Sequence, residues 1–264
     1  MGVLNVTPDS FSDGGLYDTV DKAVAHGITM AEQGAVVIDV GAASTRPGAE
    51  AVSAKQQIQR AIPVIEQLSR ETQAWISIDT SDVDVAEAAL AAGACMINDI
   101  TALASDGMIE LAARYSALVV LMHMQGTPAT MQADPVYQDV VKEVKDFLVD
   151  RAQKAQQVGI VHEGIWIDPG IGFGKNLEHN LALLRHIKTF VDTGYSVLVG
   201  TSRKSMIGHV TGRRHPQERI FGTTATIAHC VAQGVSMVRV HDVGPAMDTI
   251  KMIEAINQKI EVGR

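Results

Sequence analysis

Eight short apolar runs recur along the chain, and each is followed by a segment with helical periodicity. The runs have the length of strands, and their continuous apolar character is typical of parallel strands that are buried on both faces. They span residues 3–6, 36–39, 75–79, 95–98, 118–122, 165–168, 196–199 and 237–240. Eight units in 264 residues average about 33 residues each, close to the roughly 30 residues of a βαβ unit. The pattern predicts an α/β fold with a single (β/α)8 (TIM) barrel rather than an open doubly wound sheet.

The segments between these runs carry apolar residues at intervals of three and four, which indicates amphipathic helices. The pattern is clearest over residues 22–33, 54–70, 83–92 and 136–157. Several of these segments end at a glycine just before the next strand, as helices commonly do. These glycines are Gly34, Gly93, Gly159, Gly194 and Gly234. Because no linker or low-complexity tract interrupts the repeat, residues 1–264 are expected to form one domain.

Composition narrows the functional class. The chain has 22 Lys and Arg against 30 Asp and Glu, a net charge of −8, which argues against an extended nucleic-acid surface or a polybasic membrane patch. It has neither a transmembrane stretch of about 18 apolar residues nor the features of a signal peptide. Its two cysteines, Cys95 and Cys230, cannot form a disulfide framework and match no zinc motif. We predict a cytoplasmic protein without nucleic-acid or membrane partners.

Polar or charged residues stand at the carboxyl end of every predicted strand, where (β/α)8 barrels carry their active sites. They are Asn5, Asp39, Asp79, Asn98, His123, Asp168, Ser202, Arg203, Lys204, Arg239 and His241. Each has a structural explanation when it is considered alone, because an aspartate can cap a turn and His123 suits a buried core position. Because polar residues stand at all eight strand ends, and these ends meet at one opening of a barrel, they predict a binding site there.

The residue types indicate the class of ligand. Asp and Asn side chains without a matching set of His and Cys do not form a zinc site, but they suit a flat, nitrogen-rich heterocycle. A second group has the opposite charge and suits a phosphate or diphosphate. It comprises Arg46, Lys204, Arg239 and His241. The strand ends therefore predict a heterocycle that carries a phosphorylated arm.

Two glycine-containing loops fail the motifs that they first suggest. Residues 168–175 have neither the dinucleotide spacing nor the Walker A pattern, and residues 200–204 have Lys204 where a nucleophile elbow needs glycine. The loops at residues 7–15 and 44–49 exceed the usual length of roughly two to six residues, which is typical of lids and binding loops. Phe11 and Arg46 on these loops are expected to close over a ligand.

Motifs spread in order along nearly the whole chain resemble those of the dihydropteroate synthase family. Residues 1–15, MGVLNVTPDSFSDGG, look like the opening signature of that family. Further matches lie at residues 44–48, 98–100, 123–126, 168–175, 202–205 and 239–242. The resemblance implies a (β/α)8 transferase of folate synthesis. It would condense (7,8-dihydropterin-6-yl)methyl diphosphate with 4-aminobenzoate to give 7,8-dihydropteroate and diphosphate.

The resemblance also implies Mg²⁺ as cofactor, sulfonamides as inhibitors and a homodimer, for which residues 225–231 and 246–256 offer apolar helical faces. Its implied pterin-binding residues are Asp79, Asn98, Asp168 and Lys204, with Asp39 supporting them from behind. Its implied diphosphate-binding residues are Asn5, Arg46, Arg239 and His241, and Asn5 would also hold Mg²⁺. Its implied aminobenzoate-binding residues are Phe11, Thr45, Pro47, Phe173 and Ser202. Asp79, Lys204, Arg239 and His241 would act in catalysis.

Two features depart from the family pattern. Ala42 and Ala43 replace the acidic residue that usually precedes Ser-Thr-Arg, which is expected to alter the second loop and its affinity for aminobenzoate or sulfonamides. The family also usually carries a short segment ahead of the first strand, and this sequence starts at the strand.

Two alternative functions fit these residues less well. A pterin-binding barrel of the corrinoid methyltransferase kind would have no use for the diphosphate-binding group, so Arg46, Arg239 and His241 argue against it. An inactive barrel kept as an interaction subunit is disfavoured because Asp79, Lys204 and Arg239 are all present.

Overall fold

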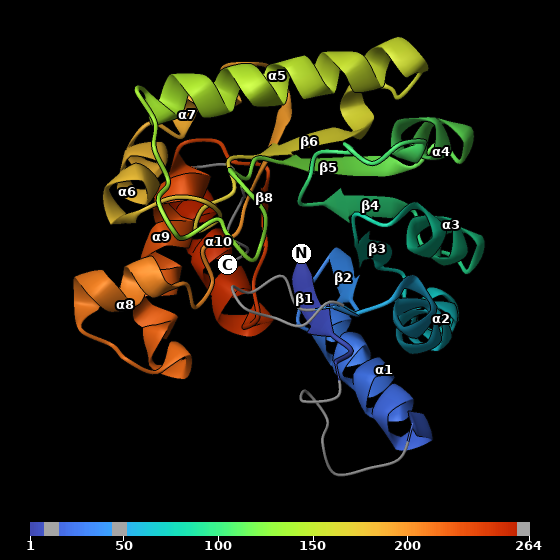
Figure 1. The fold of residues 1–264 in the computed structure, drawn as a ribbon. Coiled ribbons are helices and arrows are strands. Elements are labelled where there is room, and N and C mark those ends of the chain that lie inside the picture. Colours follow the sequence, from blue (N-terminus) through green and yellow to red (C-terminus); the bar gives the residue numbers. More distant parts are fainter. Residues whose placement is uncertain (8–15, 44–51, 258–264) are drawn as a thin grey trace.

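Eight parallel strands form one curled sheet in the computed structural model, which describes residues 1–7, 16–43 and 52–257 (Figure 1). The strands are β1 (Gly2–Asn5), β2 (Val37–Gly41), β3 (Trp75–Asp79), β4 (Met96–Asp99), β5 (Leu118–Met122), β6 (Ile165–Asp168), β7 (Ser196–Val199) and β8 (Met237–Val238). They follow one another in chain order across the sheet, and every neighbouring pair is parallel. Their bounds lie within two residues of the predicted ones.

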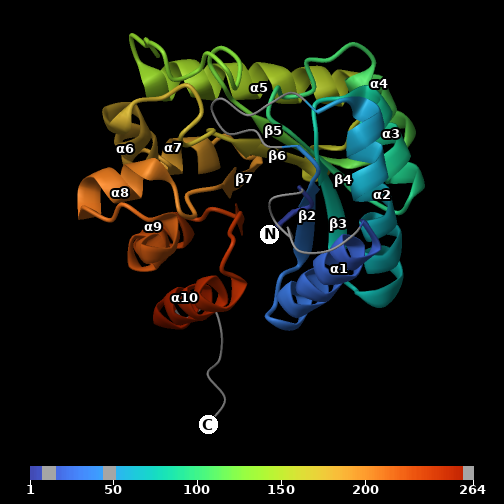
Figure 2. The same cartoon turned by 60° about the horizontal axis from the view of Figure 1, so that its bottom comes forward.

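Helices connect successive strands and cover the outside of the sheet (Figures 1 and 2). They are α1 (Leu16–Glu32), α2 (Ala54–Glu71), α3 (Val83–Ala91), α4 (Met108–Arg114), α5 (Val140–Val158), α6 (Leu177–Arg185), α7 (Lys188–Val191), α8 (Ser205–Thr211), α9 (Ile220–Ala232) and α10 (Val243–Ile256). Two 3₁₀ turns, η2 (His162–Gly164) and η3 (Pro216–Arg219), precede β6 and α9. All five glycines predicted to end helices have positive φ angles.

Two predicted helix starts are wrong: the pattern predicted a helix from residue 22, but α1 begins at Leu16, and the start of α5 differs as well. The apolar pattern predicted a helix from residue 136, but α5 begins at Val140. The Asp139 side chain caps the helix by accepting the backbone N–H groups of Val141 and Lys142. Gln125 holds both backbone polar groups of Val136, which places that residue in the loop that precedes the helix.

The ends of the sheet are joined by backbone hydrogen bonds. Val240, two residues after β8, donates to the carbonyl of Met1 at 3.0 Å and accepts the N–H of Val3 at 2.9 Å. Gly2 and Val240 form a parallel bridge. The predicted α/β fold is therefore confirmed as eight parallel strands in a curled sheet wrapped by helices.

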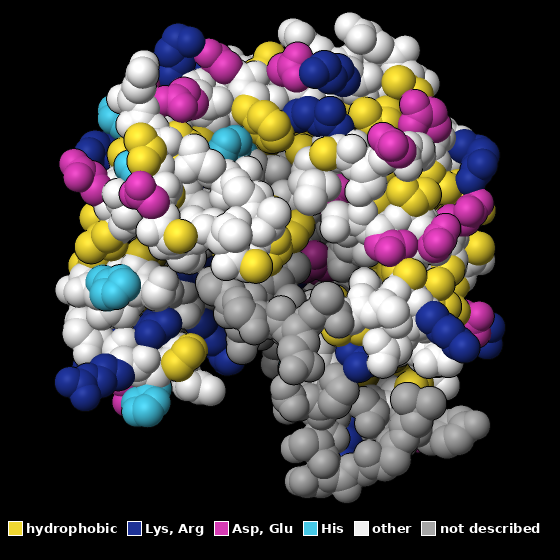
Figure 3. Space-filling model, in the orientation of Figure 1, with side chains coloured by type: hydrophobic (Ala, Val, Ile, Leu, Met, Phe, Trp, Pro, Cys, Tyr) yellow, Lys and Arg dark blue, Asp and Glu magenta, His cyan; other side chains and the backbone are white. Residues whose placement is uncertain are grey.

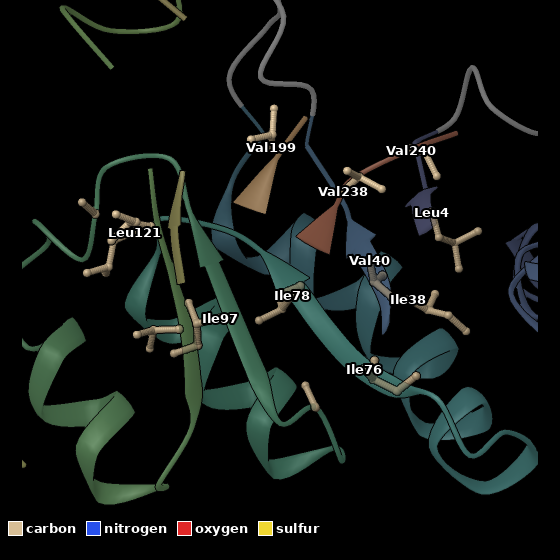
Figure 4. Packing of buried hydrophobic residues seen from close by; sticks show 14 of the residues in the cluster. Leu4, Ile38, Val40, Ile76, Ile78, Ile97, Leu121, Val199, Val238 and Val240 are labelled. Carbon is tan, nitrogen blue, oxygen red and sulfur yellow. The ribbon is translucent and has the colours of Figure 1, made fainter. Parts of the chain in front are cut away.

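The two-residue period of the strands separates two environments. Leu4, Ile38, Ile76, Ile97 and Leu121 point outward and pack in the core beneath the helices (Figure 4). The inner face of the sheet holds a smaller apolar cluster of Val37, Met96, Val120 and Leu198. Two residues further along β2 and β4, on the same inner face, lie Asp39 and Asn98. A polar layer therefore lies directly on an apolar floor, toward the carboxyl ends of the strands.

In the part of the chain that the structure describes, no helix has the length and apolar character needed to cross a membrane.

Candidate active site

Two buried aspartates and one arginine form the centre of the polar layer. Asp39, on β2, is fully buried, and its Oδ2 accepts the Nε–H of Arg239 at 2.7 Å. Arg239 follows β8, and one of its Nη groups donates to Oδ2 of Asp79 at 2.7 Å. The arginine side chain is 23% exposed. One guanidinium thus bridges the ends of two strands and leaves an edge within reach of a ligand.

Asp39 has further partners. Its Oδ1 accepts the hydroxyl of Ser77 at 2.6 Å, and its Oδ2 accepts the side-chain amide of Asn98 at 2.9 Å. Because both carboxylate oxygens are occupied and the residue has no exposed surface, Asp39 orients Asn98 and Arg239 from behind.

The Asp79 carboxyl group is buried enough to change its ionisation. Burial raises the pKa of Asp79 to about 7, the Arg239 guanidinium opposes that rise, and the charges of Asp39 and Asp99 add to it. A carboxyl group with a pKa near neutrality can accept or release a proton at the pH at which most enzymes work.

Asp168 ends β6 and shapes the loop that follows. Its Oδ1 accepts the N–H of Gly170 at 2.8 Å, so it caps the turn. Burial raises the pKa of Asp168, and the Lys204 ammonium opposes that rise. Gly170 has φ +67°, and a Cβ atom there would lie 2.0 Å from the carbonyl oxygen of His123. Only glycine lets this loop pass so close to the end of β5.

Side chains from several elements hold the same loop. The Lys204 ammonium donates to the Ile171 carbonyl, Gln132 to the Gly172 carbonyl at 2.8 Å, and the Tyr137 hydroxyl to the Gly174 carbonyl at 2.8 Å. Asn180, on α6, accepts the N–H of Gly172 at 2.6 Å. The loop that carries Phe173 is therefore held in one conformation.

Lys204 lies over the ring of Phe173. Its Nζ is 4.6 Å from the ring centroid, a cation–π geometry. Burial lowers the pKa of Lys204 to about 8, and Asp168 opposes the fall. The arrangement places an ammonium, an aromatic face and a carboxylate at the ends of β6 and β7.

The loops after β7 and β8 are joined to each other. The Ser202 hydroxyl accepts the backbone N–H of His241 at 3.2 Å and lies 3.0 Å from its Nδ1. Arg203 forms a two-pronged ion pair with Asp242, at 3.0 and 2.5 Å. Arg203 has φ +60°, a conformation that non-glycine residues rarely adopt, and the ion pair helps to hold it there.

Comparisons with known proteins identify the family. The sequence profile of the pterin binding enzymes matches residues 1–241. The chain is 45% identical over 255 residues to the dihydropteroate synthase of Escherichia coli strain K12, covering 97% of this chain and 90% of the relative. The chain belongs to the dihydropteroate synthase family.

Solved structures of this family agree. Xanthomonas albilineans dihydropteroate synthase with 4-aminobenzoic acid matches with a TM-score of 0.92 and 45% identity, covering 99% of this chain and 93% of that one. Yersinia pestis dihydropteroate synthase with a sulfonamide drug complex matches with a TM-score of 0.92 and 41% identity, covering 98% of this chain and 94% of that one. The predicted enzyme class is confirmed: the chain is a dihydropteroate synthase, a transferase.

The structure brings together most of the residues that the family resemblance singled out. Those that lie at the ends of the strands or in the loops directly after them are Asn5, Asp39, Asp79, Asn98, Asp168, Phe173, Ser202, Lys204, Arg239 and His241. Phe11, Thr45, Arg46 and Pro47 lie outside the described residues. His123 points away from this set, since its ring packs edge-on against Phe147 of α5. The core interpretation of His123 is thus confirmed.

Reasoning from the sequence missed three contributors. Ser77 precedes Asp79 by two residues on one strand, so the period of two could have placed both on the inner face. Lys175 ends both the failed nucleotide motif and the family motif at residues 168–175, and neither motif assigns it a contact. The pairing of Arg203 with Asp242 depends on how the last two loops meet, for which the sequence carries no local signal.

The residues near Asn5 can be tested for their fit to Mg²⁺. Within the described residues, no group of three or more His, Cys, Asp or Glu side chains could hold a metal ion. A Cβ atom at Gly41 would lie 3.4 Å from Asn5 Oδ1 and 3.8 Å from Asp79 Oδ2, so glycine leaves space between two oxygen donors. Mg²⁺ prefers oxygen donors and keeps several waters, so a site with few protein oxygens suits it when a substrate supplies more.

Proposed function

We propose that the chain condenses (7,8-dihydropterin-6-yl)methyl diphosphate with 4-aminobenzoate at the carboxyl ends of its strands. The observation that carries the proposal is the buried Asp39–Arg239–Asp79 network, which lies with Asn98 on the inner face of the sheet. It supplies carboxylates for a heterocycle and a cation for a phosphorylated arm in one layer.

The pterin ring is recognised by hydrogen-bonding groups of both kinds. Asp79 and Asp168 accept the ring N–H and amino donors, and Asn98 both donates and accepts. Lys204 donates to the carbonyl and ring-nitrogen side. Asp39 accepts an N–H of the Asn98 side-chain amide, and this hydrogen bond fixes the orientation of the Asn98 amide oxygen.

The diphosphate lies on the cationic side of the site. Arg239 uses two N–H groups on aspartates, and its remaining donors, together with His241 and Arg46, bind diphosphate oxygens. Asn5 would hold Mg²⁺, and the chemistry that a bound cation would supply is neutralisation of negative charge on the leaving group. The positive side chains stabilise the same charge as the carbon–oxygen bond breaks.

The amine attacks the pterin methylene carbon. Its nitrogen lone pair forms the new carbon–nitrogen bond, the electron pair of the carbon–oxygen bond leaves with diphosphate, and the proton that the nitrogen then releases passes to the departing diphosphate and on to solvent. Cleavage runs ahead of attack, and the Asp79 carboxylate stabilises the pterin cation that develops. Phe173 and Ser202 would shape the aminobenzoate pocket with Phe11, Thr45 and Pro47, and excluding water from the pocket would prevent its capture of the cation. Sulfonamides occupy this pocket as inhibitors.

The test is a coupled assay on purified protein. Diphosphate and dihydropteroate are expected in equal amounts, and only when the pterin diphosphate, 4-aminobenzoate and Mg²⁺ are all supplied. Lys204→Met should lose turnover and pterin binding, while the matched surface variant Lys154→Met should not. Diphosphate release without 4-aminobenzoate at the full rate would instead show a hydrolase and overturn the proposal.

We also propose a closed (β/α)8 barrel in a single domain. Its support is the backbone bonding of Val240 to Met1 and Val3, which joins the two ends of the sheet.

A homodimer in the cytoplasm completes the proposal. On α9 and α10 the side chains of Phe221, Met252 and Ile256 are 84%, 61% and 67% exposed. Three large apolar side chains on neighbouring helices are unfavourable in water, and a second copy of the chain would cover them.

A further inference from the structure

Lys175 is a buried lysine for which the proposed reaction has no use. It follows β6 and is 2% exposed. Its Nζ lies 2.8 Å from the carbonyl oxygen of Phe173, 3.0 Å from Nδ1 of His123 and 3.2 Å from the carbonyl oxygen of His123. Burial lowers the pKa of Lys175 to about 7, and the Asp168 carboxylate opposes the fall. In its ammonium form the side chain has three N–H donors, and these three acceptors match them one for one.

The His123 end of this arrangement is fixed. The His123 ring packs edge-on against Phe147 with centroids 5.0 Å apart, and the ring of Tyr137 lies 6.1 Å away. Burial and the Lys175 ammonium lower the pKa of His123 to about 3, so its imidazole is neutral and accepts at Nδ1. Lys175 therefore has a rigid anchor at the end of β5.

At the Phe173 end, the Phe173 N–H donates to the Gly170 carbonyl at 3.0 Å. Gln132 and Tyr137 bind the carbonyls of Gly172 and Gly174, so Lys175 adds the bond to the Phe173 carbonyl. Gly172 and Gly174 flank Phe173 with φ angles of +84° and +61°, so the backbone on either side is of the most permissive kind. The Phe173 ring nevertheless lies under the Lys204 ammonium, 4.6 Å from Nζ to the ring centroid. The Phe173 carbonyl is the group that Lys175 binds, midway between those two glycines.

The charge of Lys175 argues against a role in packing alone. In the described part of the chain no carboxylate lies within ion-pair distance of the Lys175 Nζ. A buried charge without a direct counter-ion is unfavourable, and a methionine would fill similar space without that penalty. The presence of a lysine at position 175 is therefore better explained by the three groups to which it donates than by the volume of its side chain.

We propose that Lys175 is a positioning residue: it ties the Phe173 backbone to His123 and thereby sets the Phe173 ring against Lys204. The inference rests on the proposed function, in which Phe173 lines the aminobenzoate pocket. Lys175 touches neither substrate and acts through Phe173 alone.

The kinetic test uses Lys175→Met, which keeps an unbranched side chain one heavy atom shorter and removes its donors. The KM for 4-aminobenzoate is expected to rise at least fivefold, while kcat and the KM for the pterin diphosphate change less than twofold. The matched control is Tyr137→Phe, which removes a hydrogen bond to the adjacent Gly174 carbonyl. Equal effects from both variants, or no change in the KM for 4-aminobenzoate, would overturn the proposal.

A second readout needs no turnover. The chain has five phenylalanines, so labelling with 4-fluorophenylalanine gives five ¹⁹F resonances, and Phe173→Leu assigns the one that matters. Lys175→Met should shift and broaden that resonance, and Tyr137→Phe, which adds a sixth labelled position and so a sixth resonance, should leave it in place. An unmoved Phe173 resonance would refute the positioning role even if the wild-type chain made no pteroate.

If Lys175→Met does not fold, Lys175→Arg is measured in the same two ways. Arginine keeps the charge but cannot place its planar donors on the same three acceptors. The same rise in KM and the same resonance shift are expected, and wild-type values for both would contradict the proposal.

Discussion

Arg239 connects two aspartates that lie 200 and 160 positions away from it in the sequence. One of them, Asp39, has no contact with solvent and depends on Arg239 for its charge partner. At the scale of single residues, the site is therefore a set of buried charges that satisfy one another. Removing one member leaves the others in an unfavourable state, which ties the stability of the fold to the chemistry of the site.

Arg239→Met is expected to lower the free energy of unfolding by about 3–5 kcal/mol, because it leaves a buried carboxylate unpaired. Adding Asp39→Asn should recover part of that loss, since the amide carries no charge. Urea unfolding measures both. The control is Lys154→Met, which breaks the exposed ion pair with Asp150 and should cost less than about 1 kcal/mol. An Arg239→Met variant as stable as the wild type would contradict the account of Asp39.

Asp79 predicts a pH dependence of stability. Its pKa is about 7 when folded against 3.8 ordinarily, so between pH 4 and 7 the folded chain holds a proton that the unfolded chain has lost. The free energy of unfolding therefore falls as pH rises through that window, by up to about 1.4 kcal/mol per pH unit for this group. Asp79→Asn should lack this contribution. Urea unfolding at several pH values is the measurement. The free energy of unfolding of Asp79→Asn minus that of the wild type should rise between pH 5 and pH 8, and a difference that does not change with pH would disprove the raised pKa of Asp79.

At the scale of elements, the loop after β6 contains glycines that need more than a positive φ angle. Gly170 also needs the space that a Cβ atom would fill.

The positions of the strands could be predicted from the apolar runs, because burial on both faces of a parallel strand gives a continuous apolar sequence. The start of α5 could not, since Val136 and Tyr137 continue the apolar period while Gln125 and Asp139 decide the local backbone. Side chains distant in sequence thus overrode a local pattern.

Gly170→Ala should abolish activity and lower the free energy of unfolding by more than about 3 kcal/mol, because the new Cβ would lie 2.0 Å from the His123 carbonyl oxygen. Gly212→Ala is the matched control. Gly212 has a similar φ of +75°, but nothing lies within 4 Å of its Cβ position, so only the backbone penalty of roughly 1 kcal/mol remains. Thermal unfolding and the coupled assay compare the two variants, and equal losses would show that backbone strain alone matters.

At the scale of the whole molecule, the sequence predicted which residues lie together at the carboxyl ends of the strands, but not which of them form hydrogen bonds with each other. Asn5, Asp79 and Asp168 could be assigned to one mouth because the carboxyl ends of parallel strands share an edge. The bond from Arg239 to Asp39 depends on the curl that brings β8 beside β1, and no local feature near either residue encodes it. Figure 3 shows that charged side chains also spread widely over the surface, with Lys, Arg and His near α8. The net charge of −8 therefore says little about the field within the site.

The proposed homodimer makes the last prediction. Phe221 and Met252 line a groove between α9 and α10 and are 84% and 61% exposed. Replacing both with Asp would place two charges in the interface, where burial without partners is strongly unfavourable. Sedimentation velocity should show a dimer for the wild type and a monomer for Phe221→Asp/Met252→Asp. Val161→Asp, at an apolar residue that is 64% exposed just before η2, should remain dimeric. A wild-type monomer, or a double variant that stays dimeric, would move the interface away from these helices or remove it altogether.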